Sequence, residues 1–234
     1  MDVIIGKNPV LEGLKSSLQI NKVSFYKNMG RKDIEEIILL CEEKKIPYTW
    51  VEREKLDEHG KPHQGVVAFV SSISYASLYS LIHKEGLILM LDGVTDPHNL
   101  GAIIRSAHVF GAQGLVLPKR RSASLDATSF KASAGAAAHL PIARVANLND
   151  AIKEFKEKGF WVYGAQAEAA HELSQIKFPK KTVLVFGSED KGISRLVKDG
   201  CDELYKIPMA NFESLNVSVA SGIACYSYFL QNPV

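Results

Sequence analysis

The sequence predicts an α/β protein with two parts, a small N-terminal α/β domain and a larger domain built on a mostly parallel sheet. Two observations lead to this prediction. In the first part, short β-like runs alternate with an amphipathic helix pattern. After Gly86 the apolar runs become continuous, which is typical of strands that helices cover on both faces. Repeated units of strand and helix favour an open parallel sheet.

The N-terminal part is expected to contain three strands and a helix. The predicted strands are residues 22–26, 48–51 and 65–70. Between the first two, Ile34, Ile37, Ile38 and Cys41 recur at the spacing of one helical face. The stretch that follows the third strand, residues 71–80, is rich in Ser and Tyr and is typical of a linker.

The remainder of the chain is expected to form the parallel sheet. Its four predicted strands are the fully apolar runs 87–91, 114–117, 160–163 and 182–186, and residues 148–157 have helical spacing. We therefore expect a first domain of residues 1–72, a linker of residues 73–85 and a second domain of residues 86–234. In open parallel sheets, ligands bind beyond the carboxyl ends of the strands, so the loops after these runs are candidate sites.

Composition leaves the choice of partner open. The 234 residues carry a formal net charge of +2, which permits a nucleic-acid partner without requiring one. Two basic clusters stand out locally, Lys119-Arg120-Arg121 and Lys177 with Lys180-Lys181. Solvated surface charge is the ordinary explanation for either cluster.

Cysteine usage gives no indication of a metal site or a disulfide framework. Cys41, Cys201 and Cys225 are widely spaced and form no C-x-x-C pair. This fits a reducing compartment, and we expect a cytoplasmic protein. The N-terminal residues have no basic leader with a long apolar stretch, and no apolar run reaches the roughly 18 residues of a membrane helix.

Three loops that follow apolar runs differ from ordinary connectors: residues 91–107, 185–193 and 207–220. Familiar glycine-rich motifs do not explain them. Gly187 and Gly192 have the spacing of a phosphate-binding loop, but Ile193 stands where that loop requires lysine. No G-x-G-x-x-G follows a strand, which disfavours a nucleotide-dependent oxidoreductase, and no G-x-S-x-G nucleophile turn is present.

The three loops resemble the signature motifs of the SpoU/TrmH family of RNA 2′-O-methyltransferases, in the SPOUT superfamily. The likeness covers about residues 86–230. The matching segments are Asn99 to Ala107, then Gly187-Ser188-Glu189 with Gly192, then Ile207-Pro208-Met209 with Ser214 to Ala220. One such motif alone would be weak, whereas three in the right order are highly specific.

This resemblance implies a fold, a reaction and partners. It implies that the second domain folds into a trefoil knot whose loops bind S-adenosyl-L-methionine. It also implies that the methyl acceptor is a ribose of RNA. The N-terminal part, with Gly6-Lys7-Asn8-Pro9-Val10 and residues 63–68, is similar to the family's ribosomal-protein-like substrate-binding domain. The whole arrangement is most similar to bacterial 23S rRNA guanosine-2′-O-methyltransferases. The implied partners are RNA, with 23S rRNA favoured, and a second copy in a homodimer.

The resemblance also assigns site residues. Gly187, Ile207 and Leu215 match cofactor-contact positions, although a loop glycine and two core aliphatics are the ordinary alternative. Arg105 matches the catalytic arginine, which either activates the 2′-hydroxyl directly or holds a neighbouring phosphate. Because arginine stays protonated, orientation and electrostatic help are favoured over a role as base. The alternative for Arg105 is a helix-surface ion pair.

Four further residues are candidate catalytic residues. Asn99 would cap the helix that begins there, order the active-site loop, or do both. Glu189 is expected near a helix start, where its negative charge would complement the helix dipole. The alternative is that it binds Arg105 or the RNA. Ser214 and Asn216 would bind the substrate or the arginine, or cap the final helix.

Several alternatives stay open. The final helix, residues 215–230, has small residues and the aromatics Tyr226, Tyr228 and Phe229, which suit a homodimer interface or an intrachain core. The enzyme alternative is a tRNA ribose 2′-O-methyltransferase, although the N-terminal domain favours rRNA. The non-enzyme alternative is an inactive RNA-binding protein on the same scaffold, which the presence of Arg105 and its partner residues disfavours.

Overall fold

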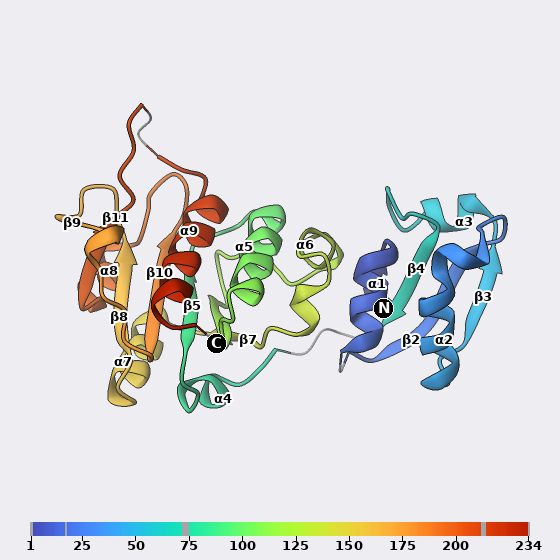
Figure 1. The fold of residues 1–234 in the computed structure, drawn as a ribbon, viewed down its shortest axis with the longest axis horizontal. Helices are drawn as coiled ribbons and strands as arrows, with labels where there is room; N and C mark the ends of the chain where they lie inside the picture. The colour runs from blue at the N-terminus through green and yellow to red at the C-terminus, as the bar shows by residue number, and fades with distance from the viewer. Residues whose placement is uncertain (1, 17, 72–74, 212–213, 234) are drawn as a thin grey trace.

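The computed structural model describes every residue except 1, 17, 72–74, 212–213 and 234. It contains a four-stranded sheet and a seven-stranded sheet. Figure 1 shows each sheet in its own body of the molecule, which we call the N-terminal body and the catalytic body. This two-part α/β architecture confirms the predicted fold class.

The N-terminal body has a mixed sheet in the order β1-β4-β2-β3. Its strands are β1 (Asp2–Ile5), β2 (Ile20–Tyr26), β3 (Tyr48–Val51) and β4 (Val66–Val70), and its helices are α1 (Lys7–Lys15), α2 (Glu35–Glu43) and α3 (Arg53–Asp57). The three predicted strands and the helix α2 are confirmed. Strand β1 was not predicted, because its apolar residues Val3, Ile4 and Ile5 are consecutive, and so short an apolar run without alternation does not distinguish a strand from a helix.

The catalytic body has a sheet in the order β7-β6-β5-β10-β8-β11-β9, in which every recorded pairing is parallel. Its strands are β5 (Leu87–Asp92), β6 (Gly114–Pro118), β7 (Ile142–Val145), β8 (Trp161–Ala165), β9 (His171–Glu172), β10 (Thr182–Gly187) and β11 (Glu203–Lys206). Its helices are α4 (Leu78–Ile82), α5 (Pro97–Val109), α6 (Ala127–Ala132), α7 (Leu148–Glu157), α8 (Arg195–Gly200) and α9 (Val217–Gln231). The four predicted strands and helix α7 are confirmed.

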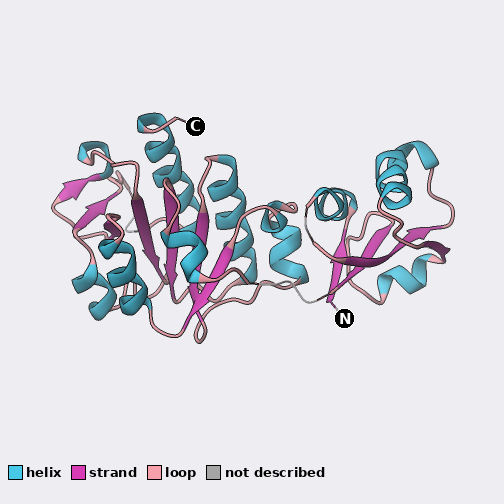
Figure 2. Cartoon of the chain, turned by 90° about the horizontal axis from the view of Figure 1, so that it is seen from below, coloured by secondary structure: helices cyan, strands magenta, loops and turns pink. Residues whose placement is uncertain are grey.

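Helices cover both faces of this large sheet, as Figure 2 shows. On β5, Leu87, Leu89 and Leu91 enter a core shared with α5 and α9. The alternate residues Ile88 and Met90 enter a second core shared with α7. Both faces of the strand are therefore buried, which explains why its sequence is continuously apolar. The trefoil knot stays a prediction.

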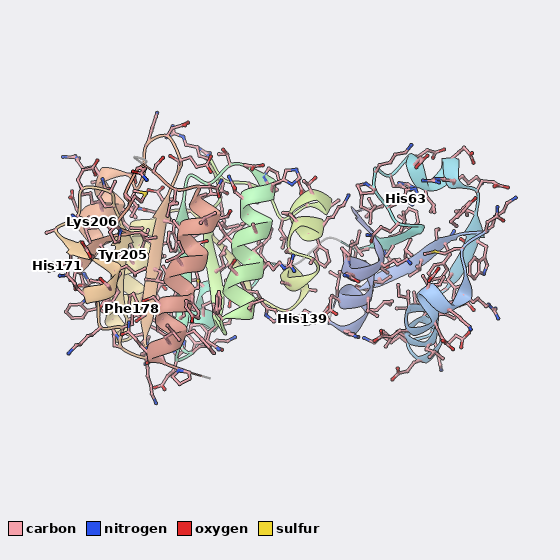
Figure 3. All side chains as sticks on the ribbon, turned by 45° about the horizontal axis from the view of Figure 1, so that its top comes forward. His63, His139, His171, Phe178, Tyr205 and Lys206 are labelled. Atoms are coloured by element: carbon pink, nitrogen blue, oxygen red, sulfur yellow. The ribbon has the colours of Figure 1, made fainter. Side chains whose placement is uncertain are left out.

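The two bodies meet where α1 and β1 contact α6 and the turn Ala136–Ala138. At this junction, which Figure 3 marks with His139, the Nε2 atom of His139 lies 3.0 Å from Glu12 Oε2. A Cβ atom on Gly135 would lie only 2.4 Å from the Cβ of Glu12, so the contact is close. The predicted linker, residues 73–85, contains α4, which packs against β7 and α7. The exact domain boundaries stay a prediction.

Candidate active site

Three loops meet beyond the carboxyl ends of β5, β10 and β11. Because these strands belong to one parallel sheet, their carboxyl ends lie along the same edge. The loops after β10 and β11 line a cavity of about 300 Å³, which we call the catalytic cavity. Its size is at the lower end of the range for small-molecule sites. The loop after β5 reaches the other two through the side chain of Asn99.

A hydrogen-bond network joins the three loops. Asn99 Nδ2 donates to Glu189 Oε1 at 3.1 Å, and Asn216 Nδ2 donates to the same oxygen at 2.5 Å. Asn216 Nδ2 also lies 3.0 Å from Asn99 Oδ1. The structure therefore brings together three of the predicted site residues, one from each motif.

Asn99 is not the N-cap of its helix, which corrects one expectation from the sequence. Asp96 caps α5 by accepting hydrogen bonds from the backbone N–H groups of His98 at 3.1 Å and Asn99 at 3.3 Å. Pro97 takes the first helical position, which suits a residue that has no N–H to satisfy. The Asn99 carboxamide is thereby left for the network.

Asn216 both caps a helix and joins the network. Its Oδ1 accepts the backbone N–H of Ser218 at 2.9 Å, which caps α9. Its Nδ2 is directed to Glu189 and Asn99. The expected capping role of Asn216 is therefore confirmed, whereas its hydrogen bonds in the site go to Glu189 and Asn99 rather than to Arg105, and substrate binding stays a prediction. Ser214 is exposed and lines the catalytic cavity without being the cap.

Gly187 ends β10 at a turn too tight for any side chain. After it, Ser188 and Gly192 pair as an antiparallel bridge, with N···O distances of 3.2 and 2.9 Å. A Cβ atom on Gly187 would lie 1.8 Å from the carbonyl carbon of Gly192 and 2.1 Å from the nitrogen of Ile193. The glycine is therefore required by the path of this loop, whatever the loop binds.

The other two predicted cofactor-contact residues, Ile207 and Leu215, are half-buried and line the same cavity. Other lining residues lie outside the predicted loops, among them the polar residues Gln166, Glu168 and Lys206. A signal existed for Gln166 and Glu168, because they follow β8, a predicted strand, at the carboxyl edge. Lys206 was missed because its strand β11 is short and partly polar.

Carboxylates outnumber amines around the catalytic cavity. The charged lining residues are Glu168, Glu189, Asp190, Lys191 and Lys206. A hydrogen bond from Gln166, followed by one from its own backbone, lowers the pKa of the Glu168 carboxyl, so this group is ionised at neutral pH. The charged lining therefore has one more negative group than positive groups.

Tyr205 lies on β11 beside Lys206, and Figure 3 labels both residues. Its hydroxyl is buried and has no hydrogen-bond partner among the residues that the structure describes. Burial raises its pKa well above the ordinary value for tyrosine. The hydroxyl is therefore neutral at physiological pH and is not a base.

Arg105 lies apart from this network. It is exposed on α5 and does not line the catalytic cavity. Within the described part of the chain, it takes part in no salt bridge, so the expected alternative of a surface ion pair is not observed. Glu189 binds the two asparagines rather than Arg105, and it lies in a turn well before α8 rather than at a helix start.

A second hollow, of about 350 Å³, lies on the N-terminal body. Its walls include an aromatic ring and two cations, from Tyr26, Arg53 and Lys61. The buried His63 holds one wall, because its Nε2 lies 2.9 Å from Asp57 Oδ1 and its Nδ1 accepts the Gly65 N–H at 2.9 Å. Lys61 is exposed but lies 2.9 Å from Asp57 Oδ2, another lining residue, so the positive charge that this N-terminal hollow presents to solvent comes mainly from the exposed Arg53.

The described residues give little support for a metal site or for a cysteine nucleophile. Among them, no group of three or more His, Cys, Asp or Glu residues could hold a metal ion. Burial raises the pKa of Cys41 to about 11 and the pKa values of Cys201 and Cys225 to about 12, so none is a thiolate nucleophile at neutral pH. The helices described here include none that is long and apolar enough to cross a membrane.

Comparison with known proteins identifies both parts of the chain. Residues 86–226 match the SpoU rRNA Methylase family, and residues 3–76 match the domain described as RNA 2′-O ribose methyltransferase substrate binding. A putative TrmH family tRNA/rRNA methyltransferase of Bacillus subtilis (strain 168) is 43% identical over 242 residues, which cover 100% of this chain and 97% of that protein.

Solved structures agree in fold. The SpoU methyltransferase AviRb from Streptomyces viridochromogenes, solved in complex with the cofactor AdoMet, has a TM-score of 0.85 at 24% identity, over 98% of this chain and 89% of that one. A putative RNA methyltransferase of the TrmH family from Porphyromonas gingivalis has a TM-score of 0.80 at 25% identity, over 97% and 88% of the two chains. The family match spans more than half of the sequence, and the three-loop network contains one residue from each family motif. The chain therefore belongs to the SpoU rRNA methylase family of RNA methyltransferases.

Proposed function

We propose that the protein transfers a methyl group from S-adenosyl-L-methionine to a ribose 2′-hydroxyl of RNA. The observation that carries this proposal is the network of Asn99, Glu189 and Asn216 beside the catalytic cavity. Further support comes from the bound AdoMet of a structural neighbour and from the 2′-O ribose description of the N-terminal domain model.

The catalytic cavity fits this cofactor in charge and shape. S-adenosyl-L-methionine has a sulfonium, an ammonium and one carboxylate, so its net charge is positive, whereas the charged lining has an excess carboxylate. We assign Gly187, Ile207 and Leu215 to its contact surface, where an unsubstituted backbone and aliphatic side chains face the cavity. When bound, the cofactor supplies an electrophilic methyl group.

The protein's own task is to position and activate the ribose. A hydroxyl is a poor nucleophile until its proton is removed or its developing charge is stabilised. We assign Arg105 to orient the ribose or its phosphate through charge-assisted hydrogen bonds. Asn99 and Asn216 fix the Glu189 carboxylate and hence the turn after β10, and Ser214 is assigned a hydrogen bond to the substrate.

For the substrate, we propose a guanosine of 23S rRNA, which places the protein in the cytoplasm. We assign RNA binding to residues 1–72, a linker to residues 73–85 and catalysis to residues 86–234. Arg53 in the N-terminal hollow suits a phosphate of RNA. A tRNA ribose is the alternative, because the name of the Bacillus subtilis relative includes both RNA classes.

The test is methyl transfer from labelled S-adenosyl-L-methionine to separate 23S rRNA and tRNA substrates, followed by nucleoside analysis. We expect the label in 2′-O-methylguanosine from 23S rRNA. Label in tRNA alone would change the substrate but keep the reaction. RNA binding without methyl transfer, and without cofactor binding by calorimetry, would indicate an inactive scaffold and overturn the proposal.

We also propose that two copies form a dimer through α9. Val219, Ile223, Tyr226 and Leu230 are 39–61% exposed and lie on one face of this helix. An exposed apolar stripe of this kind indicates an interface. Tyr228 does not belong to it, contrary to one sequence expectation, because it is 4% exposed and donates to the Lys180 carbonyl at 2.6 Å.

Light scattering tests this assembly. We expect a species of twice the 25.7 kDa chain mass, and a shift to the single-chain mass in the variant Ile223→Asp. The control Leu196→Asp changes an exposed apolar residue of α8, a helix that packs on the other face of the sheet, and should leave the mass unchanged. A wild-type protein that is active at the single-chain mass would rule out the dimer.

A further inference from the structure

A basic loop between β6 and α6 has no part in the site described above. Lys119, Arg120 and Arg121 are consecutive and all exposed. In the described ranges, none of them forms a salt bridge within 4.0 Å of a carboxylate. In a chain of net charge +2, this basic loop concentrates three positive charges in one place.

The backbone of the basic loop is held by its neighbours. Arg144 of β7 donates from Nη2 to the Lys119 carbonyl at 2.8 Å. On the other side, the Ala123 N–H donates to the Val94 carbonyl at 2.8 Å. Arg121 has a φ of +57°, a left-handed conformation that is uncommon for residues other than glycine and that turns the chain sharply. The charged side chains therefore extend from a fixed backbone.

The basic loop also lies on the route from the catalytic edge to the N-terminal body. It follows the carboxyl end of β6, which is parallel to β5, so it emerges at the same edge as the three site loops. Its contact at Val94 is in the segment that leads to Asn99. At its other end the chain enters α6, which contacts β1 of the N-terminal body and which Figure 1 shows between the two bodies.

We propose that Lys119, Arg120 and Arg121 bind RNA phosphates between the methylated nucleotide and the RNA segment on the N-terminal body. This assignment rests on the proposed function and adds a contact that belongs to neither the catalytic cavity nor the N-terminal hollow. Guanidinium groups bind phosphate with two parallel hydrogen bonds, and such contacts position a nucleic acid without reading its sequence. The basic loop thus sets where along the RNA the ribose enters the site.

The test compares two charge-matched variants. Arg120→Gln/Arg121→Gln removes two charges from the basic loop. Lys177→Gln/Lys180→Gln removes two exposed charges from the segment before β10, at the opposite, amino edge of the sheet. Both variants have the same net charge, so a difference between them depends on position. RNA affinity is measured for each across a range of salt concentrations.

For the basic-loop variant, the slope of log affinity against log salt should become shallower by about 1.4 to 1.8, because two phosphate contacts are lost. Its affinity near physiological salt should fall about tenfold, while the control keeps the wild-type slope. An unchanged slope in the basic-loop variant, or an equal change in the control, would overturn the assignment.

Two further readouts separate this proposal from the function on which it rests. Calorimetric binding of S-adenosyl-L-methionine, and the methylation rate at saturating RNA, should stay within about twofold of wild type in the basic-loop variant. If the wild type methylates RNA and the basic-loop variant keeps its salt slope, only the basic-loop assignment fails. If the wild type neither binds nor methylates RNA, both proposals fail.

Discussion

The catalytic cavity and the N-terminal hollow are built in different ways. The shape of the cavity depends on main-chain geometry, since Gly187 admits no side chain and the network of Asn99, Glu189 and Asn216 holds three loops together. The N-terminal hollow depends on exposed charged side chains, such as Arg53, around a buried histidine. A substitution that adds one carbon atom at Gly187 should therefore disrupt the cavity strongly. Removal of one cation from the hollow should lower RNA affinity only moderately.

The substitution Gly187→Ala should have the largest effect on the cavity. The added methyl group would overlap the backbone of Gly192, at a distance of 1.8 Å, so the turn after β10 must open. We expect S-adenosyl-L-methionine affinity, measured by calorimetry, to fall by at least about 10²-fold, which is about 2.7 kcal/mol of binding free energy.

Gly200→Ala is the matched control, because its added Cβ atom would have its nearest contact at 3.5 Å. It should bind the cofactor like the wild type. Wild-type affinity in Gly187→Ala would show that this turn does not shape the cofactor site.

Next in size, Arg105→Ala should lower single-turnover methyl transfer by about 10²-fold, as is usual for a positioned catalytic group. Cofactor affinity should be unchanged, because Arg105 does not line the cavity. Lys153→Ala on α7, an exposed cation on the other face of the sheet, is the control. A rate within about threefold of wild type would remove Arg105 from the mechanism.

The N-terminal hollow should respond more weakly. Arg53→Gln is expected to lower RNA affinity about three- to tenfold through loss of one phosphate contact, with cofactor affinity unchanged. Lys55→Gln provides a control on the same short helix, because Lys55 is exposed but does not line the hollow. Equal losses in both variants would mean that overall charge, rather than the hollow, attracts the RNA.

The sequence predicts the parallel sheet well for a physical reason. Strands β5, β6, β8 and β10 are covered on both faces, so nearly every residue is apolar and the run is easily recognised. The unpredicted strands β7, β9 and β11 are short, lie at or next to the edges of the sheet and carry polar residues such as Arg144, so their sequence pattern is weaker. Because the sequence did not predict β11, it also did not predict that Lys206 lines the catalytic cavity.

The site was predicted less completely, because side-chain partners depend on tertiary contacts. The family motifs identified Asn99, Glu189 and Asn216, but their mutual hydrogen bonds join segments 90 and 117 positions apart, which no local pattern encodes. The capping role given to Asn99 was wrong because Asp96, one residue before the proline, supplies the cap. That error matters for experiment, since Asn99 can now be changed without removing the helix cap.

A double-mutant cycle on this network tests the central claim most directly. The variants are Asn99→Ala, Glu189→Ala and their combination, and the measured quantity is the single-turnover rate of 2′-O-methylnucleoside formation in RNA. Each single change removes a hydrogen bond to a charged group, so we expect about a 10- to 100-fold loss. Because the residues act as one unit, the double variant should be no slower than the slower single variant. Losses that multiply, single variants at the wild-type rate, or methylation of a base instead of the ribose would contradict the account.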